Sequence, residues 1–298
     1  MKTVLLRGRG VCTRLHEPVL SRLGGIDFSY VDRDDTPSSP AKSDLLVIGS
    51  PPSAHEEELI RLHARSRAVL IEKPMGHNLA AAERIHDLVC RWKQPVFANY
   101  QLRKHNVLVE MKKLISSLCG RIRILYRSAA WLQQIQGDLW YQHLSEGGTC
   151  LYAVGSHIID LVLAAGLCVD GVSLRSGTRT LSKATIEMSC GAIGVIIDIN
   201  LEALHEQFSL DVVEDGGALP RNVYDLISAQ WGANCPEYPK GSLRSSQRHG
   251  IWQACQKHVY RELLEHPEDA RGMANTADAI KVHRVLEGLK ADYAARFR

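Results

Sequence analysis

The stretch Thr3-Val4-Leu5-Leu6, continued by Arg7-Gly8-Arg9-Gly10-Val11-Cys12-Thr13, decides the fold. A short apolar run meets a Gly-x-Gly turn, and apolar residues then recur with helical spacing from Leu15 to Leu23. Glycines at such a strand-to-helix turn let a backbone approach a pyrophosphate, which the first N–H groups of the helix can bind. A tight turn without a ligand is the alternative, because the third fingerprint position holds Thr13 instead of glycine.

The alternation of strands and helices continues through the first hundred residues. Further strands are predicted at 26–31, 45–48, 68–71 and 95–98, and helices at 56–63 and 79–92. This order is typical of α/β proteins with a parallel, doubly wound sheet. We predict that residues 1–104 form a Rossmann domain.

The pattern changes near Asn106 and predicts a second domain over residues 105–298. A helix is expected at 107–118, and one-sided alternation predicts strands at 121–128, 185–189, 194–200 and 207–213. These strands would form an open, mostly antiparallel sheet in an α+β domain. Helices at 151–165, 246–265 and 276–295 are expected to cover that sheet, with packing of the last helix on the Rossmann domain as an alternative.

Bulk composition excludes several classes of protein. The formal charge is only +3 and the Lys and Arg residues are scattered, which argues against nucleic acid binding. The N-terminus runs directly into the glycine turn, so neither a signal peptide nor a membrane span is expected. Eight cysteines lack a C-x-x-C pair, so no metal site is predicted, and a reducing, cytoplasmic location is the simplest expectation.

Asp32 bears on the choice of cofactor. It lies 24 residues beyond Gly8, at the end of the predicted second strand, where an acid can bind the ribose hydroxyls of an adenosine. NAD is therefore favoured over NADP. The neighbouring Arg33 could instead meet a 2′-phosphate, which keeps NADP as an alternative. A solvated turn that contains Asp32 and Asp34 is the structural alternative.

Two further segments suggest proton transfer. Glu72-Lys73-Pro74 follows a buried strand at the edge where α/β sheets bind ligands, and a lysine in a partly dry cleft can exchange a proton. His157 and Asp160 lie three residues apart, on one helix face, and Gly155 would leave room for a ligand. Taken singly, Lys73 is more often a surface lysine and His157 a core histidine.

In combination, these segments resemble the Gfo/Idh/MocA family (glucose-fructose oxidoreductase, inositol dehydrogenase and rhizopine catabolism) over most of the chain. The resemblance rests on Gly-x-Gly, the turn Ser50-Pro51-Pro52-Ser53-Ala54-His55, Ile71-Glu72-Lys73-Pro74, Asn99-Tyr100-Gln101-Leu102-Arg103, and Gly147-Gly148 followed by Gly155-Ser156-His157-x-x-Asp160. Many members carry an acid where this chain has Ala153, so the identity of the general base stays open between Lys73 and His157. Members also usually have another helix and strand where this chain has the short link from Asp32 to Leu45, so the resemblance implies a shortened Rossmann domain.

The resemblance implies a site and an assembly. Lys73 and His157 would be catalytic, and the chain would form a homodimer or homotetramer. Substrate would meet Tyr100, Arg103, His157 and Asp160, and the aromatic stretch of the sequence adds Trp140 and Tyr141 as predicted substrate contacts. The cofactor would contact Gly8, Gly10, Val11, Cys12, Thr13, Asp32, Arg33, Ser50, Pro51, Pro52, His55, Glu72 and Lys73.

The resemblance also implies an NAD(P)-dependent oxidoreductase that acts on CH–OH groups, and specifically a sugar dehydrogenase. Aromatic residues between Trp131 and Gln142 favour a nucleotide-linked sugar, of the type of UDP-N-acetylglucosamine oxidised at C3, although these side chains could equally fill a core. Two alternatives stay open. One is a catalytically inactive nicotinamide-binding sensor or scaffold, and the other is an NAD-dependent glycosidase.

Overall fold

The structure is a computed structural model that describes residues 1–32, 42–116, 120–128, 143–178, 182–203, 207–213, 221–225, 246–270 and 272–297. Arg33, Trp140 and Tyr141 lie outside these residues. The chain forms two compact units. Unit 1 comprises Met1–Lys104, Ser145–Gly147 and Trp252–His283, and unit 2 comprises His105–Leu144, Gly148–Ile251 and Arg284–Arg298.

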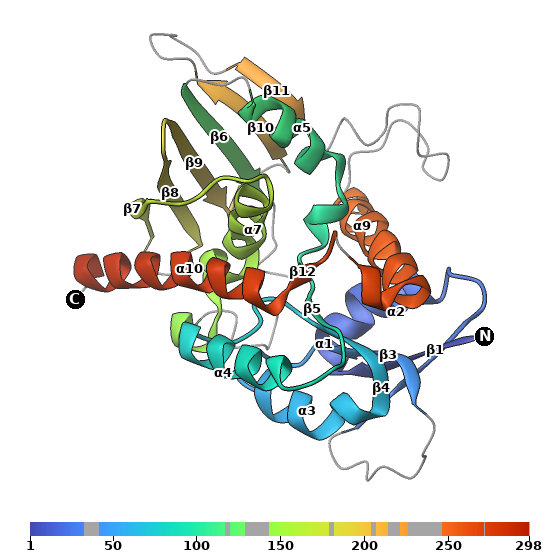
Figure 1. Cartoon of the computed structure of the whole chain (residues 1–298). Coiled ribbons are helices and arrows are strands. Elements are labelled where there is room, and N and C mark those ends of the chain that lie inside the picture. The colour runs from blue at the N-terminus through green and yellow to red at the C-terminus, as the bar shows by residue number, and fades with distance from the viewer. Residues whose placement is uncertain are drawn as a thin grey trace. The chain divides into compact units, whose positions relative to one another are not determined.

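Unit 1 is built on a six-stranded sheet of order β12-β5-β4-β3-β1-β2 (Figure 1). Five strands are mutually parallel, and the short β12 adds antiparallel to β5 at one edge. The predicted Rossmann-type sheet is confirmed, and only β12 was not predicted. The strands are β1 (Lys2–Arg7), β2 (Ile26–Tyr30), β3 (Ser43–Ile48), β4 (Ser66–Ile71), β5 (Val96–Ala98) and β12 (Ala274–Asn275).

The first helix of unit 1 begins at Arg9, earlier than the apolar spacing from Leu15 predicted. It consists of α1 (Arg9–Val11), the π-helical η1 (Cys12–His16) and α2 (Glu17–Leu20). Pro18 accounts for the wide turn, because proline has no N–H with which to bond the carbonyl of Arg14. The other helices of this unit are α3 (His55–Leu62), η2 (His63–Arg65), α4 (Leu79–Cys90), η3 (Gln101–Lys104), most of η5 (Leu144–Glu146), η7 (Pro267–Asp269), most of α9 (Ser246–Glu265) and the first part of α10 (Thr276–Phe297).

The placement of α9 corrects one prediction. Its bounds are as predicted, but its residues from Trp252 onward belong to unit 1 and pack in the core of the Rossmann sheet, whereas the helix was expected to cover the antiparallel sheet (Figure 1). An amphipathic stripe specifies that a helix face is buried, and it does not specify against which sheet. One buried cluster joins Val259, Tyr260, Leu263 and Leu264 of α9 to Cys12, Val19 and Leu20 of the first helix and to Val4, Leu6, Leu45, Val47, Ala68 and Leu70 of the strands.

Unit 2 contains a second six-stranded sheet, of order β11-β10-β6-β9-β8-β7. All neighbours are antiparallel except β6 and β9, which are parallel, so the expected mostly antiparallel sheet is confirmed. Two of its strands, β7 and β11, were not predicted. The strands are β6 (Gly120–Arg127), β7 (Gly171–Gly177), β8 (Lys183–Cys190), β9 (Ile193–Asn200), β10 (Gln207–Val213) and β11 (Arg221–Asp225).

The helices of unit 2 include α5 (Asn106–Ile115) and the continuous pair η6 (Leu151–Gly155) and α7 (Ser156–Ala164). The prediction that Gly155 leaves room for a ligand was wrong. A Cβ atom there would lie 3.4 Å from Ile199 Cδ1 and 3.8 Å from Ile186 Cδ1, so the glycine lets the helix approach the sheet. The last helix, α10 (Thr276–Phe297), contributes its second half to unit 2, where Asp292 accepts a hydrogen bond of 2.7 Å from the Leu174 backbone N–H in β7.

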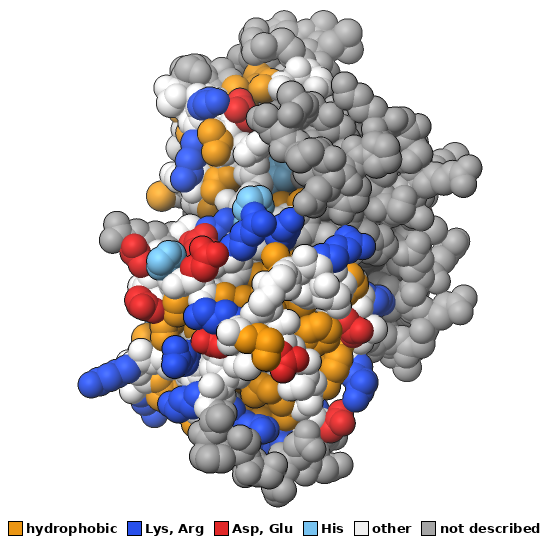
Figure 2. All heavy atoms as spheres, turned by 90° about the vertical axis from the view of Figure 1, so that its right-hand side faces the viewer, with side chains coloured by type: hydrophobic (Ala, Val, Ile, Leu, Met, Phe, Trp, Pro, Cys, Tyr) orange, Lys and Arg blue, Asp and Glu red, His pale blue; other side chains and the backbone are white. Residues whose placement is uncertain are grey.

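One segment of the described chain, Leu144–Ala164, is long and apolar enough to cross a membrane. Within the protein 89% of its most apolar window is buried, and at Gly155 the segment approaches the sheet of unit 2. A core position therefore explains its apolar composition. On the described part of the face shown in Figure 2, basic and acidic side chains are interspersed and do not form one patch.

Candidate cofactor and catalytic site

The glycine turn after β1 is tightly constrained. Gly8 has φ +91°, and a Cβ atom there would lie 2.5 Å from the Ser50 backbone nitrogen. A Cβ atom at Gly49 would in turn lie 2.6 Å from Val11 Cγ1 and 2.7 Å from Cys12 Sγ. The turn and the end of β3 therefore pack backbone to backbone, which only glycine permits at these two positions.

Gly10 is constrained differently, because the nearest atom to a Cβ placed there is Arg14 Nη2 at 4.0 Å. The space beside this glycine is open, and it lies at the N-terminus of a helix that continues from Arg9 to Leu20. An open cradle beside unpaired backbone N–H groups fits the pyrophosphate of a dinucleotide. The guanidinium of Arg14, whose Nε donates to the Gly10 carbonyl at 3.2 Å, lies beside this cradle.

Asp32 lies just beyond the end of β2, as predicted, and is exposed. Its carboxylate lies 3.5 Å from Arg9 Nη2, and the Arg9 guanidinium lies 4.8 Å from the centre of the Tyr30 ring. The Tyr30 hydroxyl donates to Glu17 at 2.7 Å and lies 3.1 Å from Thr13 Oγ1. Gly8, Gly10, Thr13 and Asp32 thus lie around one end of the first helix, as an adenosine site requires.

The turn from Ser50 to His55 is held from inside the protein. The two ring nitrogens of His55 lie 2.8 Å from the Ser50 carbonyl and 3.0 Å from the Met75 carbonyl. Ser50 Oγ donates to Glu58 at 2.6 Å, and Glu58 also pairs with Arg7. Because these side chains are engaged in internal hydrogen bonds, Ser50 and His55 would contact a cofactor through their backbone atoms.

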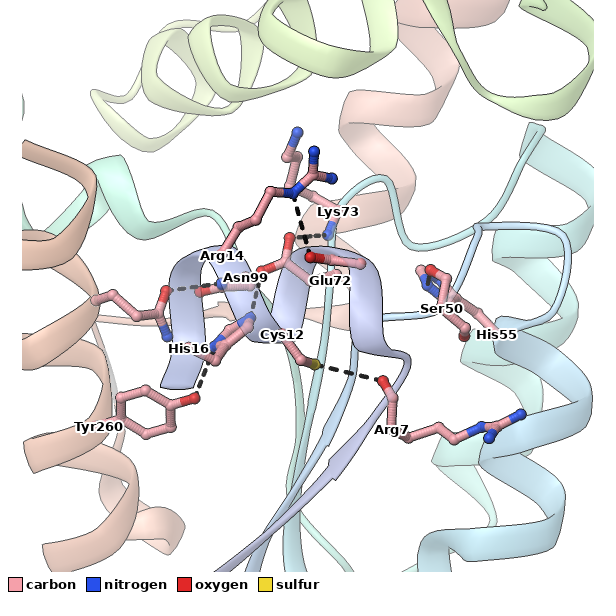
Figure 3. Close-up of polar contacts among 12 residues, drawn as sticks. Arg7, Cys12, Arg14, His16, Ser50, His55, Glu72, Lys73, Asn99 and Tyr260 are labelled. Atoms are coloured by element: carbon pink, nitrogen blue, oxygen red, sulfur yellow. Dashed lines mark hydrogen bonds and ion pairs between the residues drawn. The ribbon is translucent and has the colours of Figure 1, made fainter. Parts of the chain in front are cut away.

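Glu72, at the carboxyl end of β4, is the centre of a buried polar network (Figure 3). His16 Nε2 bonds Glu72 Oε1 at 2.9 Å, and Tyr260 Oη bonds His16 Nδ1 at 2.7 Å. Asn99 Nδ2 donates to the same Oε1 at 2.5 Å and to Gln256 Oε1 at 2.8 Å. Burial by itself would raise the pKa of Glu72, but the hydrogen bonds from His16 and Asn99 and the charges of His16 and Lys73 outweigh it and lower the pKa.

Lys73 follows Glu72, and its backbone N–H donates to Glu72 Oε2 at 3.2 Å. The peptide bond from Lys73 to Pro74 is cis. Burial lowers the pKa of the Lys73 amine to about 8, and the Glu72 charge opposes that decrease. An amine with this pKa holds both protonation states in useful amounts near neutral pH, which general acid–base chemistry requires.

The predicted substrate residues fall in both units. In unit 1 Tyr100 is buried, and Arg103 pairs with Asp278 at 3.0 Å, an internal contact that the sequence did not predict. In unit 2 His157 and Asp160 are both buried on α7, and Ala153 lies in η6. Trp140, Tyr141 and Arg33 lie outside the described residues, so their assigned roles stay predictions. In the part of the chain that the structure describes, no group of three or more His, Cys, Asp or Glu side chains could hold a metal ion.

The sequence did not predict four members of the network: His16, Asn99, Gln256 and Tyr260. A signal existed for His16, because it follows Cys12 by four residues and precedes Val19 and Leu20 by three and four, which places it on the buried stripe of the first helix. A buried imidazole needs polar partners. No comparable signal links Gln256 and Tyr260 to a strand that lies over 150 residues earlier in the chain.

Comparison with known proteins agrees with this geometry. The family model described as "Oxidoreductase family, NAD-binding Rossmann fold", that of the Gfo/Idh/MocA family, matches residues 16–100. Most of the Rossmann domain thus matches this family. The match confirms the predicted family, the oxidoreductase class and NAD as the cofactor of that class. It begins after Gly8 and Gly10, whose fit to a dinucleotide rests on the structure. No curated protein matches the chain by sequence.

Solved structures extend the likeness in fold to the whole chain. GenD2 from gentamicin A biosynthesis, in complex with NAD, has a TM-score of 0.73 at 16% identity, covering 98% of this chain and 94% of its own. The WlbA dehydrogenase from Bordetella pertussis, in complex with NADH and UDP-GlcNAcA, has a TM-score of 0.74 at 13% identity, with 99% and 96% covered. A putative myo-inositol dehydrogenase from Sinorhizobium meliloti 1021 has a TM-score of 0.71 at 13% identity, with 99% and 98% covered. At these identities the likeness shows the fold, and it confirms the predicted fold class.

Proposed function

We propose that the protein is an NAD-dependent dehydrogenase that oxidises a secondary carbinol of a sugar, with Lys73 exchanging the hydroxyl proton. The main support is the position of Lys73. It lies at the carboxyl end of β4, directly beside a buried carboxylate, at the sheet edge where open α/β folds bind their ligands. When bound, NAD supplies the redox chemistry by accepting a hydride from the carbinol carbon.

The chain itself then has two tasks, binding and proton transfer. Oxidation of the alcohol to a ketone releases the hydroxyl proton, which the neutral amine of Lys73 takes up to become an ammonium. A pKa of about 8 leaves a substantial neutral fraction at neutral pH. His157 is the second proposed acid–base residue, because a neutral imidazole can exchange a proton near pH 7. Ala153 supplies no acid to assist it, so we assign the first role to Lys73.

For the substrate we propose a nucleotide-linked sugar, of the type of UDP-N-acetylglucosamine oxidised at C3. The aromatic residues at 131–142 support stacking on a sugar or a base. The WlbA dehydrogenase, which shares the fold, was crystallised with UDP-GlcNAcA. Free sugars and inositols are the comparison substrates, since a putative myo-inositol dehydrogenase shares the fold as well.

The first test compares Lys73→Met with the wild type and with Lys93→Met, which removes an exposed lysine from the same unit. We expect Lys73→Met to lower kcat by roughly 10²- to 10⁴-fold while NAD binding changes little, because the proton exchange and not the cofactor site is lost. NADH formation and an NAD titration would be measured. A normal kcat in Lys73→Met would refute the assignment. His157→Gln, measured in parallel, tests the second residue.

The substrate panel also separates the two alternative functions. A dehydrogenase produces free NADH with at least one of the nucleotide sugars, free sugars or inositols. A sensor would bind NAD and reduce it with none of them. An NAD-dependent glycosidase would retain NAD through purification and cleave a glycoside without net NADH. Either of the last two results would overturn the proposal of a dehydrogenase.

A further inference from the structure

The network around Glu72 has a feature that packing alone does not require: its donors converge on one carboxylate. Glu72 Oε1 accepts hydrogen bonds from His16 and Asn99, and Oε2 accepts a hydrogen bond from the backbone N–H of Lys73. All of the side chains that hold it are buried. A carboxylate fixed by three donors can neither rotate away nor easily take up a proton.

The first arm fixes the orientation of an imidazole ring. An ionised carboxylate only accepts, so His16 donates to Glu72 from Nε2, and its Nδ1 bonds the Tyr260 hydroxyl on the other side of the ring. Tyr260 therefore holds the His16 ring in the orientation in which Nε2 reaches Glu72. The Tyr260 hydroxyl comes from α9, which lies far along the chain from β4, the strand that Glu72 follows.

The second arm also begins on α9, one turn earlier. Gln256 accepts from Asn99, whose other amide hydrogen goes to Glu72. This arrangement leaves Asn99 Oδ1 and Gln256 Nε2 buried and without a hydrogen-bond partner in the described part of the chain. Unsatisfied buried polar atoms are unfavourable. Pointing the Asn99 amide at Glu72 therefore leaves two polar atoms unsatisfied and costs stability. Such a cost favours a functional role for the contact between Asn99 and Glu72.

We infer that α9 acts on the reaction through these two arms: Tyr260 with His16, and Gln256 with Asn99, hold Glu72 as a fixed counter-ion, and Glu72 sets the pH at which Lys73 gives up its proton. This inference rests on the proposed role of Lys73. His16, Asn99, Gln256 and Tyr260 are positioning residues. The titratable groups that interact electrostatically with Glu72 are His16 and Cys12 from η1, Lys73 from its own segment, His55 from α3 and Tyr260 from α9.

The test measures the titration of Lys73 directly, without NAD or substrate. The folded protein is labelled briefly with acetic anhydride over a range of pH, and acetylation of Lys73 is quantified by mass spectrometry. We expect Glu72→Gln to shift the labelling midpoint of Lys73 to lower pH by about one unit or more, because an opposite charge nearby favours the ammonium. This corresponds to a roughly tenfold loss of proton affinity.

Variants of the two arms test the part played by α9. His16→Gln and the double change Tyr260→Phe with Gln256→Leu should shift the midpoint in the same direction, by less than Glu72→Gln does. Tyr152→Phe is the matched control, because it removes a buried hydroxyl that bonds Glu287 in unit 2. An unchanged midpoint in Glu72→Gln overturns the inference. A shift in Glu72→Gln with none in the folded α9 variants overturns the role of α9.

Activity measurements distinguish positioning from a structural effect. With the wild-type substrate, the rise of kcat/KM with pH should move to lower pH in the same variants, whereas general damage would lower kcat/KM at every pH without moving the profile. The two proposals also fail separately. A fully active Lys73→Met would refute the proposed function, and the labelling of Lys73 would still report whether Glu72 and α9 set its titration.

Discussion

The two glycines after β1 look alike in the sequence and differ in the structure. A Cβ atom at Gly8 would overlap the backbone of Ser50 at 2.5 Å, and the φ of +91° disfavours any other residue. We expect Gly8→Ala to lower the free energy of unfolding by roughly 2 to 4 kcal/mol. Urea unfolding of the variant measures this difference, and a change within experimental error would contradict the packing described for the turn.

We expect Gly10→Ala to weaken NAD binding without lowering the stability of the protein. Among the described residues the added methyl group meets no atom closer than 4.0 Å, and alanine favours the helix by about 0.5 to 1 kcal/mol over glycine. The methyl group would, however, fill the cradle beside the helix N-terminus. We expect stability to be kept or slightly increased and NAD binding to weaken about tenfold or more, equivalent to about 1.4 kcal/mol. Unweakened NAD binding would show that the pyrophosphate lies elsewhere.

At the scale of single elements, α4 depends on its N-cap. Asn78 precedes the helix in an extended conformation, and its side chain accepts from the Ala81 N–H at 2.8 Å. We expect Asn78→Ala to lower the free energy of unfolding by about 0.5 to 2 kcal/mol, because one helix-end N–H loses its acceptor. Asn78→Ser, which supplies another acceptor, should recover most of the loss in the same urea experiment.

The packing of α9 on the Rossmann sheet gives a second prediction for an element. Leu263 is fully buried in the core that this helix shares with the strands. We expect Leu263→Ala to lower the free energy of unfolding by about 2 to 5 kcal/mol, since a cavity is left in that core. The exposed neighbour Glu265 provides the control, because Glu265→Ala removes no buried contact. Equal effects of the two changes would contradict this placement of α9.

The sequence predicted most elements of both units because their cause is local. Apolar runs and helical spacing mark β1, β3, β4 and α4 without knowledge of their neighbours. The Gly-x-Gly turn, Asp32 and Lys73 were found in the same way, at the ends of predicted strands. The support of Glu72 by α9 could not be predicted, because nothing in Ser246–Glu265 shows which sheet it covers. The short edge strand β12 has only two residues and leaves no pattern.

At the scale of the whole molecule, two buried histidines predict how stability depends on pH. Burial lowers the pKa of His105 to about 4 and that of His283 to about 3. In the unfolded chain both take up protons below their ordinary value of 6.5, while the folded protein keeps them neutral. The unfolded state therefore binds more protons in this range, and stability falls as the pH decreases from about 6.5 to 4.

Each unit of pKa difference corresponds to about 1.4 kcal/mol, so the loss should reach several kcal/mol. Urea unfolding at a series of pH values measures it. His105→Asn and His283→Gln keep an acceptor for the N–H groups of Val107 and Gly76, and they do not titrate. We expect the double variant to show a flatter dependence on pH, and a slope equal to that of the wild type would contradict the assignment.

Unit 1 is discontinuous in the sequence, because both Met1–Lys104 and the distant segment Trp252–His283 belong to it. A chain that ends at Lys104 would leave one face of its sheet without α9. We expect such a fragment to bind a hydrophobic dye and to unfold without a cooperative transition. Joining 252–283 to it through a flexible linker should restore cooperativity, and a cooperative fragment without that segment would contradict the importance of α9.

This discontinuity has a consequence during synthesis on the ribosome. Roughly 150 residues separate Lys104 from Trp252, and at about 5 to 20 residues per second translation needs on the order of 10 to 30 s to cover them. Throughout that interval the apolar face of the nascent Rossmann sheet that α9 later covers stays exposed. The part of the protein that emerges first is thus among the last to mature, and a chaperone that shields apolar strands would have its longest opportunity there.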